Sequence, residues 1–234
     1  SISGIPLPSK AFLLSTLEQA VKNSLKKGYH SRDTVFQNVM KSGVSKILLK
    51  GETYSAAPNL KRIQMIESWR YDGETIFLDA SCLVYGFNGQ LLDTVDYSRT
   101  EAFTRSPSGS PVLYIEHSGD VIDYDQRKGQ HSIHIDISLI PSHAAALFFT
   151  VSAWTTTLKQ IYQPSAQLYD SVSDTEMCRY KLEDQDTGDK TAVIMCKLHR
   201  PSPGGRWQLT SIGHVGYGRA GTYASIHRDI QKYL

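Results

Sequence analysis

Acidic and histidine side chains gather in one stretch of the chain. They are His117, Asp120, Asp123, Asp125, His131 and His134. Imidazole and carboxylate groups that lie close together in the chain could form a transition-metal site or provide a general base. On a strand, however, His131 and His134 have opposite parity and point to opposite faces.

The three cysteines, Cys82, Cys178 and Cys196, are the other groups that could react. Their number is odd and no CxxC spacing occurs, which argues against a disulfide framework and a structural zinc site. Cys82 and Cys196 share strand parity with apolar neighbours and are predicted to be buried and inert. Cys178 is predicted to lie at a strand start and to be exposed. Free thiols fit a reducing compartment, so we expect a cytoplasmic protein.

Motifs that position a catalytic group by backbone geometry are missing from the sequence. It contains no GxSxG elbow, no HExxH helix and no P-loop, and its Gly-Tyr-Gly-Arg-Ala-Gly run at 216–221, which has GxGxxG spacing, is interpreted as a turn. We therefore predict that the protein is not an enzyme and has no catalytic residues. A module that binds or scaffolds protein partners is the expected alternative.

Composition argues against two classes of partner. Lys and Arg number 25 against 23 Asp and Glu, a net charge of +2 without a basic stripe, which disfavours nucleic acid. Hydrophobic residues make up 40 %, and no apolar run approaches the roughly 18 residues that cross a bilayer. No signal-like segment follows Ser1, which agrees with the expected cytoplasmic location.

A helical hairpin is predicted near the start of the chain. Residues 9–27 form the first helix, with one apolar face made by Leu14, Leu17, Val21 and Leu25. A shorter helix follows from Ser31 to Gly43. We predict that residues 1–50 are a helical N-terminal extension whose apolar faces could pack on a partner.

Short β-type runs separated by turn signals replace the helical pattern after Gly51. The predicted strands are 63–69, 77–86, 112–117, 132–138, 146–154, 166–172, 177–182, 191–199 and 207–214. This pattern predicts a mainly β domain over residues 51–234, built as a sandwich or barrel. A last helix is predicted over 222–234, where Tyr223, Ile226, Ile230 and Tyr233 make one face that docks on a sheet.

Two blocks of the β region have a distinctive sequence. The first combines Trp-Arg-Tyr-Asp-Gly-Glu at 69–74, Leu-Asp-Ala-Ser at 78–81 and Val-Asp-Tyr at 95–97. The second joins His-Ser-Gly-Asp at 117–120 to Ile-His-Ile-Asp-Ile at 133–137. In order and spacing they resemble the TerD family, whose Asp-Leu-Asp-Ala-Ser strand precedes a Gly-Asp-Asn loop and a Val-Asp-Leu strand. The resemblance covers roughly residues 60 to 234.

The resemblance implies a two-sheet TerD-like β-sandwich that holds calcium through acidic loops and takes part in tellurite resistance and wider stress responses. It makes Asp79, Asp120, Asp123 and Asp125 the candidate metal ligands, the last two as replacement oxygens. Phe77 and Val121 stand where the family has Asp and Asn. Gly-Gln-His at 129–131 aligns with the family's Asp-Asp-Glu. We therefore expect a degraded calcium site.

Two functional hypotheses follow. In the first, the protein is a non-enzymatic binding or scaffolding module with a degraded calcium site that acts through protein–protein interaction. In the second, it is a calcium-binding stress-response protein of the tellurite-resistance type. Asp79 would otherwise be a structural hydrogen-bond acceptor and Asp120 part of an Asx-type turn. A calcium-dependent rise in melting temperature would distinguish the two hypotheses, because a ligand of the folded state stabilises it.

Overall fold

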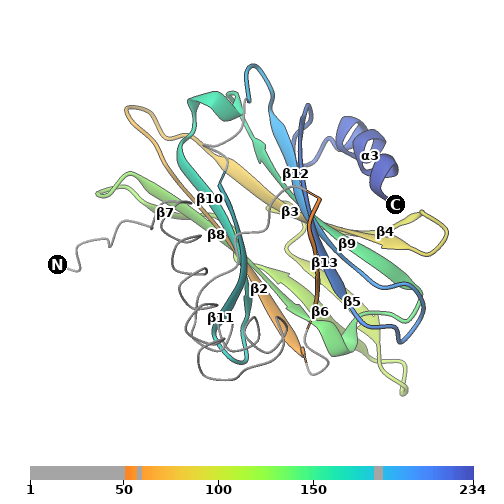
Figure 1. Cartoon of the computed structure of the whole chain (residues 1–234). Helices are drawn as coiled ribbons and strands as arrows, with labels where there is room; N and C mark the ends of the chain where they lie inside the picture. The colour runs from red at the N-terminus through yellow and green to blue at the C-terminus, as the bar shows by residue number, and fades with distance from the viewer. Residues whose placement is uncertain (1–50, 57–59, 182–186) are drawn as a thin grey trace, which may run out of the picture. The chain divides into compact units, whose positions relative to one another are not determined.

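The computed structural model describes residues 51–56, 60–181 and 187–234. These residues form two antiparallel sheets that enclose a common apolar core, followed by a C-terminal helix (Figure 1). The predicted mainly β, two-sheet sandwich is therefore confirmed. The predicted hairpin at 9–43 lies outside the described residues.

The two sheets are built from segments far apart in the sequence. The six-stranded sheet contains, in order, β1 (Thr53–Ser55), β13 (Gln208–Gly216), β12 (Ala192–His199), β9 (Ala144–Ala153), β3 (Leu78–Gly86) and β4 (Leu91–Val95). The seven-stranded sheet contains β11 (Thr175–Lys181), β10 (Tyr162–Asp170), β2 (Arg62–Arg70), β8 (Lys128–Asp136), β6 (Pro111–His117) and β5 (Glu101–Arg105), with β7 (Val121–Asp123) paired to β8. Two single turns of 3₁₀-helix, η1 (Ile137–Leu139) and η2 (Leu158–Gln160), lie between strands.

The strands that the sequence did not predict are β1, β4, β5 and β7. Each has only three to five residues. β1, β4 and β5 lie at sheet edges and β7 pairs with β8 alone, so these strands bury few side chains and lack the alternation that marks longer strands.

Alternation is clearest on β2, where burial follows every second residue from Ile63 to Trp69. By contrast, β3 is buried on both faces. Leu78, Ala80, Cys82 and Val84 contribute to the core between the sheets, and Leu83 and Tyr85 to a second apolar cluster. A sheet that is covered on both faces gives continuous apolar runs rather than alternation.

The C-terminal helix accounts for that second cluster. α3 (Ala224–Ile230) continues into η4 (Gln231–Tyr233), so the predicted helix over 222–234 is present but shorter. Ile226 and Ile230 are buried with residues of β3, β9, β12 and β13. Nδ1 of His227 lies 2.6 Å from the Tyr85 hydroxyl and ties the helix to β3. Within the described ranges, no helix is long and apolar enough to cross a membrane.

Candidate functional site

A polar cluster is buried between the sheets where β2, β6 and β8 approach β3. On β2 and β8 the inward positions are mostly apolar, but Glu67 and His131 also face inward. The two residues lie directly opposite each other in the antiparallel register, and both are 0 % exposed. The cluster therefore puts two ionisable side chains where a sandwich normally places apolar ones.

Both ring nitrogens of His131 have polar partners. Nε2 lies 2.6 Å from Oδ1 of Asp120, and Nδ1 lies 3.3 Å from Oε2 of Glu67. The backbone N–H of Ala80 also donates to Nδ1, at 3.3 Å. β4 pairs with β3 only from Cys82 onward, which leaves that edge of β3 open at Ala80. His131 thus links a surface aspartate, a buried glutamate and the open edge of the opposite sheet.

Aromatic rings enclose His131 on two sides. The centroids of Trp69 and of His117 each lie 5.0 Å from the His131 centroid. The Trp69 indole donates from Nε1 to the carbonyl of Ile76 at 2.6 Å, which fixes its orientation. Its ring lies directly over Gly129, where an added Cβ would be 2.2 Å from Cζ2. Glycine is required at position 129 because any side chain there would collide with the indole.

Burial and mutual contact shift the pKa values of the cluster in opposite directions. Burial raises the pKa of Glu67 despite its contact with His131. Burial would lower the pKa of His131, but the hydrogen bonds and charges of Glu67 and Asp120 outweigh it and raise this pKa. Burial, with His131 nearby, lowers the pKa of His117 to about 4. The arrangement fits a proton held between Glu67 and His131, beside a neutral His117.

Asp79 is the second buried acid of the cluster and is 4 % exposed. Burial, followed by the charge of Glu67, raises its pKa to about 7. Oδ2 of Asp79 and Oε1 of Glu67 have no hydrogen-bond partner among the described residues. A buried oxygen without a partner is costly as a carboxylate and less so as a protonated acid. Both observations favour protonated carboxyls at neutral pH.

The structure separates the four predicted metal ligands into two pairs. Asp79 is buried in the cluster and the exposed carboxyl of Asp120 contacts it through His131, whereas Asp123 and Asp125 point to solvent. Asp123 Oδ1 accepts a hydrogen bond from the backbone N–H of Gln126 at 2.9 Å, as in an Asx-type turn. Among residues 51–56, 60–181 and 187–234, no group of three or more His, Cys, Asp or Glu is arranged to hold a metal ion.

The cluster does not fit calcium. That cation needs about six to eight oxygen ligands, mostly ionised carboxylates and carbonyls. Here Glu67 and Asp79 favour their protonated forms, and the carboxylate of Asp120 is already bonded to a ring nitrogen. The TerD resemblance implied a glutamate at this position, whereas His131 contributes nitrogen instead of oxygen.

Two further expectations concern side-chain direction. His134 is exposed and lies 3.4 Å from Gln64 Nε2, on the opposite face from His131, as the strand parity predicted. The prediction that Cys178 is exposed was wrong, because its exposure is only 7 %. β11 begins at Thr175, so Cys178 lies inside the strand and not at its start.

Sequence reasoning missed Glu67, the acid that faces His131. A signal was available, because Glu67 has the same strand parity as Ile63, Met65 and Trp69. A lone acid on the apolar face of a strand needs a buried partner. The nearest histidines in the acidic stretch were therefore candidate partners.

Comparison with known proteins agrees with this architecture. The TerD domain profile matches residues 45–226. The chain belongs to the TerD family. It is 28 % identical over 158 residues to the tellurium resistance protein TerZ of Serratia marcescens, which covers 67 % of this chain and 74 % of that protein. It is also 28 % identical over 104 residues to the chemical-damaging agent resistance protein B of Clostridium acetobutylicum, covering 42 % of this chain and 73 % of the relative.

Two crystal structures share the TerD fold with this chain. One is a homologue of the telluride resistance protein TerD from Streptomyces coelicolor A3(2), with a TM-score of 0.54 and 14 % identity over 71 % of this chain and 96 % of that one. The other is a protein of unknown function, with a TM-score of 0.54 and 16 % identity over 71 % of this chain and 95 % of that chain. At such identities the likeness establishes the fold alone.

Proposed function

We propose that this TerD-family protein serves in the response to chemical stress, of the tellurium-resistance type, as a non-enzymatic module that binds protein partners without calcium. The names of its relatives, a tellurium resistance protein and a chemical-damaging agent resistance protein, support the stress role. The observation that supports a function without calcium is the contact of His131 with both Asp120 and Glu67. An imidazole bonded to two acids takes up the carboxylates that a cation would require.

Thermal unfolding of chelator-stripped protein, with and without millimolar calcium, tests the calcium-independent mode. A ligand that binds only the folded state must raise the melting temperature. We expect no rise for the wild-type protein. The His131→Glu variant introduces the carboxylate that the TerD resemblance implies at this position, and a calcium-dependent rise in this variant alone would assign the loss of calcium binding to the histidine.

A calcium-binding role is the second candidate, because Glu67 Oε1 and Asp79 Oδ2, which have no hydrogen-bond partner among the described residues, would be available to a cation if both acids were ionised. If calcium raises the melting temperature of the wild-type protein, and Asp79→Asn combined with Asp120→Asn removes the rise, this role replaces the calcium-independent one. The exposed pair Asp123→Asn and Asp125→Asn is the matched control for general loss of acidic charge.

The stress role is tested separately, in a bacterial strain that lacks its own TerD-family genes. Expression of the chain should increase survival on tellurite or on a DNA-damaging agent. The double variant Glu67→Leu, His131→Leu keeps the volume of the core but removes the cluster. Equal survival with the empty vector and the wild-type gene would contradict the stress role whatever the calcium result.

A further inference from the structure

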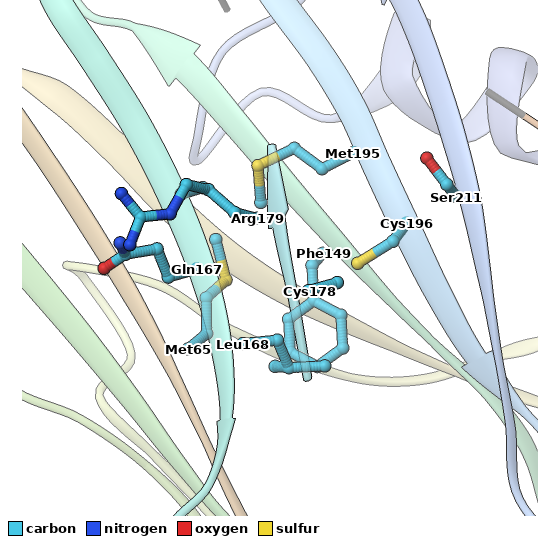
Figure 2. Close-up of a pocket in the computed structure, with 10 residues that line it drawn as sticks. Met65, Phe149, Gln167, Leu168, Cys178, Arg179, Met195, Cys196 and Ser211 are labelled. Carbon is cyan, nitrogen blue, oxygen red and sulfur yellow. The ribbon is translucent and has the colours of Figure 1, made fainter. Parts of the chain in front are cut away.

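A second buried feature lies between the sheets, between β2, β10 and β11 on one side and β9, β12 and β13 on the other. It is a cavity of about 20 Å³, enough for one water-sized atom or ion. Four of its ten lining residues carry sulfur, namely Met65, Cys178, Met195 and Cys196. Figure 2 shows the sulfur atoms of Met65, Met195 and Cys196 among the lining residues, with the side chains of Arg179 and Gln167 to one side of them. The chain has only four methionines and three cysteines, so this is a strong concentration of sulfur.

Irregular pairing brings these side chains inward. β11 and β12 each contain a Met-Cys dipeptide, Met177-Cys178 and Met195-Cys196. Between β10 and β11 the register skips Met177, and between β9 and β12 it skips Met195. A β-bulge of this kind re-aims neighbouring side chains that would otherwise alternate. Both members of each dipeptide are accordingly buried in the core between the sheets.

The two cysteines come from opposite sheets and meet at the cavity. A hydrogen bond between their thiols, together with burial, raises the pKa of Cys196 well above its usual value. Both sulfurs are free thiols. The other walls of the cavity include Phe149, Ala166 and Leu168.

We propose that this cavity is a binding site for a soft monovalent metal cation, Cu(I) in the cell. Thiolate and thioether sulfurs are the donors that select Cu(I) among common metal ions, whereas zinc sites use Cys, His and carboxylate ligands without thioethers. Cu(I) would displace one proton from one of the two thiols and form one copper–sulfur bond there. The other thiol and the thioethers of Met65 and Met195 would complete the ligand set as neutral donors.

Charge balance supports this ligand set. One Cu(I) and one thiolate form an electrically neutral unit, which an apolar cavity accepts at low cost. Two thiolates around the same ion would leave one negative charge uncompensated inside the sandwich. The guanidinium of Arg179 is already paired with Glu176 at 2.7 Å and lies at the rim. The site is therefore expected to release one proton for each ion bound.

Metal binding is tested on the full chain in the reduced state and without oxygen. The protein is titrated with Ag(I), a redox-inert stand-in for Cu(I), and the retained metal is counted after desalting. A competition with a Cu(I)-specific chromogenic chelator then measures the Cu(I) affinity. We expect one ion per chain and one proton released. The Met65→Leu, Met195→Leu double variant, which preserves volume, should bind Cu(I) at least tenfold more weakly.

Three controls keep the result unambiguous. Cys178→Ser with Cys196→Ser should abolish retention, whereas Cys82→Ala, which removes the remaining buried thiol, should retain one ion. Metal-free melting curves identify any variant that fails to fold, and the methionine variant stands in if the cysteine variant does so. Retention of about one ion per thiol, no retention at all, or an unchanged Cu(I) affinity in the methionine variant would each overturn the proposal. None of these outcomes bears on the proposed stress role.

Discussion

Two residues of β2, Met65 and Glu67, face the same interior but enter chemically opposite regions. Glu67 joins a histidine and two aspartates in a hydrogen-bonded cluster with shifted pKa values. Met65 joins a cavity lined by thioethers and thiols. The first region is held by directional contacts between ionisable groups, and the second by packing of polarisable side chains. One strand with simple alternation thus supplies a rigid polar region and an adaptable apolar one.

This difference between directional polar contacts and packing predicts how each region responds to substitutions and to pH. Removing one member of a buried polar cluster leaves its partner unsatisfied, whereas replacing a methionine by leucine mainly changes shape. Mutations and changes in pH should therefore change the free energy of unfolding strongly when they act on the Glu67–His131 cluster and weakly when they act on the sulfur-lined cavity.

The largest expected effect is that of His131→Leu, which leaves Glu67 buried without its partner. We expect a loss of roughly 3 to 5 kcal/mol in the free energy of unfolding, as for other broken buried pairs. The double variant Glu67→Leu, His131→Leu should recover most of that loss, because it removes both polar groups. Urea unfolding at pH 7 measures all three proteins. His134→Leu, on the exposed face of the same strand, should change stability by less than about 0.5 kcal/mol. Equal losses in the single and double variants would mean that the pair contributes only packing.

The next effect is the pH dependence that Asp79 imposes. Its folded pKa of about 7 exceeds the ordinary value of 3.8, so its contribution is complete below pH 3.8 and is lost as pH rises to about 7. The raised pKa values of Glu67 and His131 act in the same direction. Asp79→Asn should therefore be more stable than wild type at pH 8 by roughly 3 to 4 kcal/mol and nearly equal to it at pH 4.

The pKa of His117 is shifted so that its effect on stability has the opposite dependence on pH, and a His117 variant is therefore a matched control for Asp79→Asn. Its folded pKa of about 4 lies below the ordinary 6.5, so its contribution is present above pH 6.5 and is lost as pH falls to about 4. His117→Gln should remove this loss of stability at low pH. The loss of stability that occurs as the pH is raised should then be easier to observe. Denaturant midpoints from pH 4 to 8 test both variants. A flat difference between wild type and Asp79→Asn across that range would contradict the shifted pKa of Asp79.

A smaller effect is expected at Gly129, which lies under the Trp69 indole. Gly129→Ala places a Cβ about where the ring stands, and overpacking of this kind costs about 1 to 3 kcal/mol. The loss should shrink in a Trp69→Leu background, where the ring is absent. Gln130→Ala, the next residue on β8, is the control. Additive losses of Gly129→Ala and Trp69→Leu in urea unfolding would show that the two positions do not collide.

The sequence predicted the longer elements well because their side chains carry a periodic signal. The alternation of β2 and the apolar run of β9 are visible without the structure. The short strands at sheet edges are not, since β4 and β5 bury few side chains and depend on their neighbours for pairing. Register irregularities are also invisible in one sequence. Cys178 was expected to be exposed because the sequence placed the start of its strand too late.

The candidate site was predictable only in part. The aspartate of the Leu-Asp-Ala-Ser motif and the one in the Gly-Asp turn were identified; the first is buried in the cluster and the second contacts it from the surface through His131. The pairing of Glu67 with His131 depends on the register between β2 and β8, which the sequence does not specify. Spacing along the chain also suggested that Asp123 and Asp125 would join them. The loop instead turns both residues toward solvent.

The smallest expected effect belongs to the adaptable region. Met195→Leu keeps nearly the same volume in a cavity that already has free space, so the metal-free protein should lose less than about 1.5 kcal/mol. The loss should also be the same at pH 4 and pH 8, because no group that titrates in this range changes its partner. Urea unfolding at both pH values measures this directly. A pH-dependent loss would show that the sulfur-lined cavity and the Glu67–His131 cluster are coupled through β2, and the two regions would then have to be treated as one.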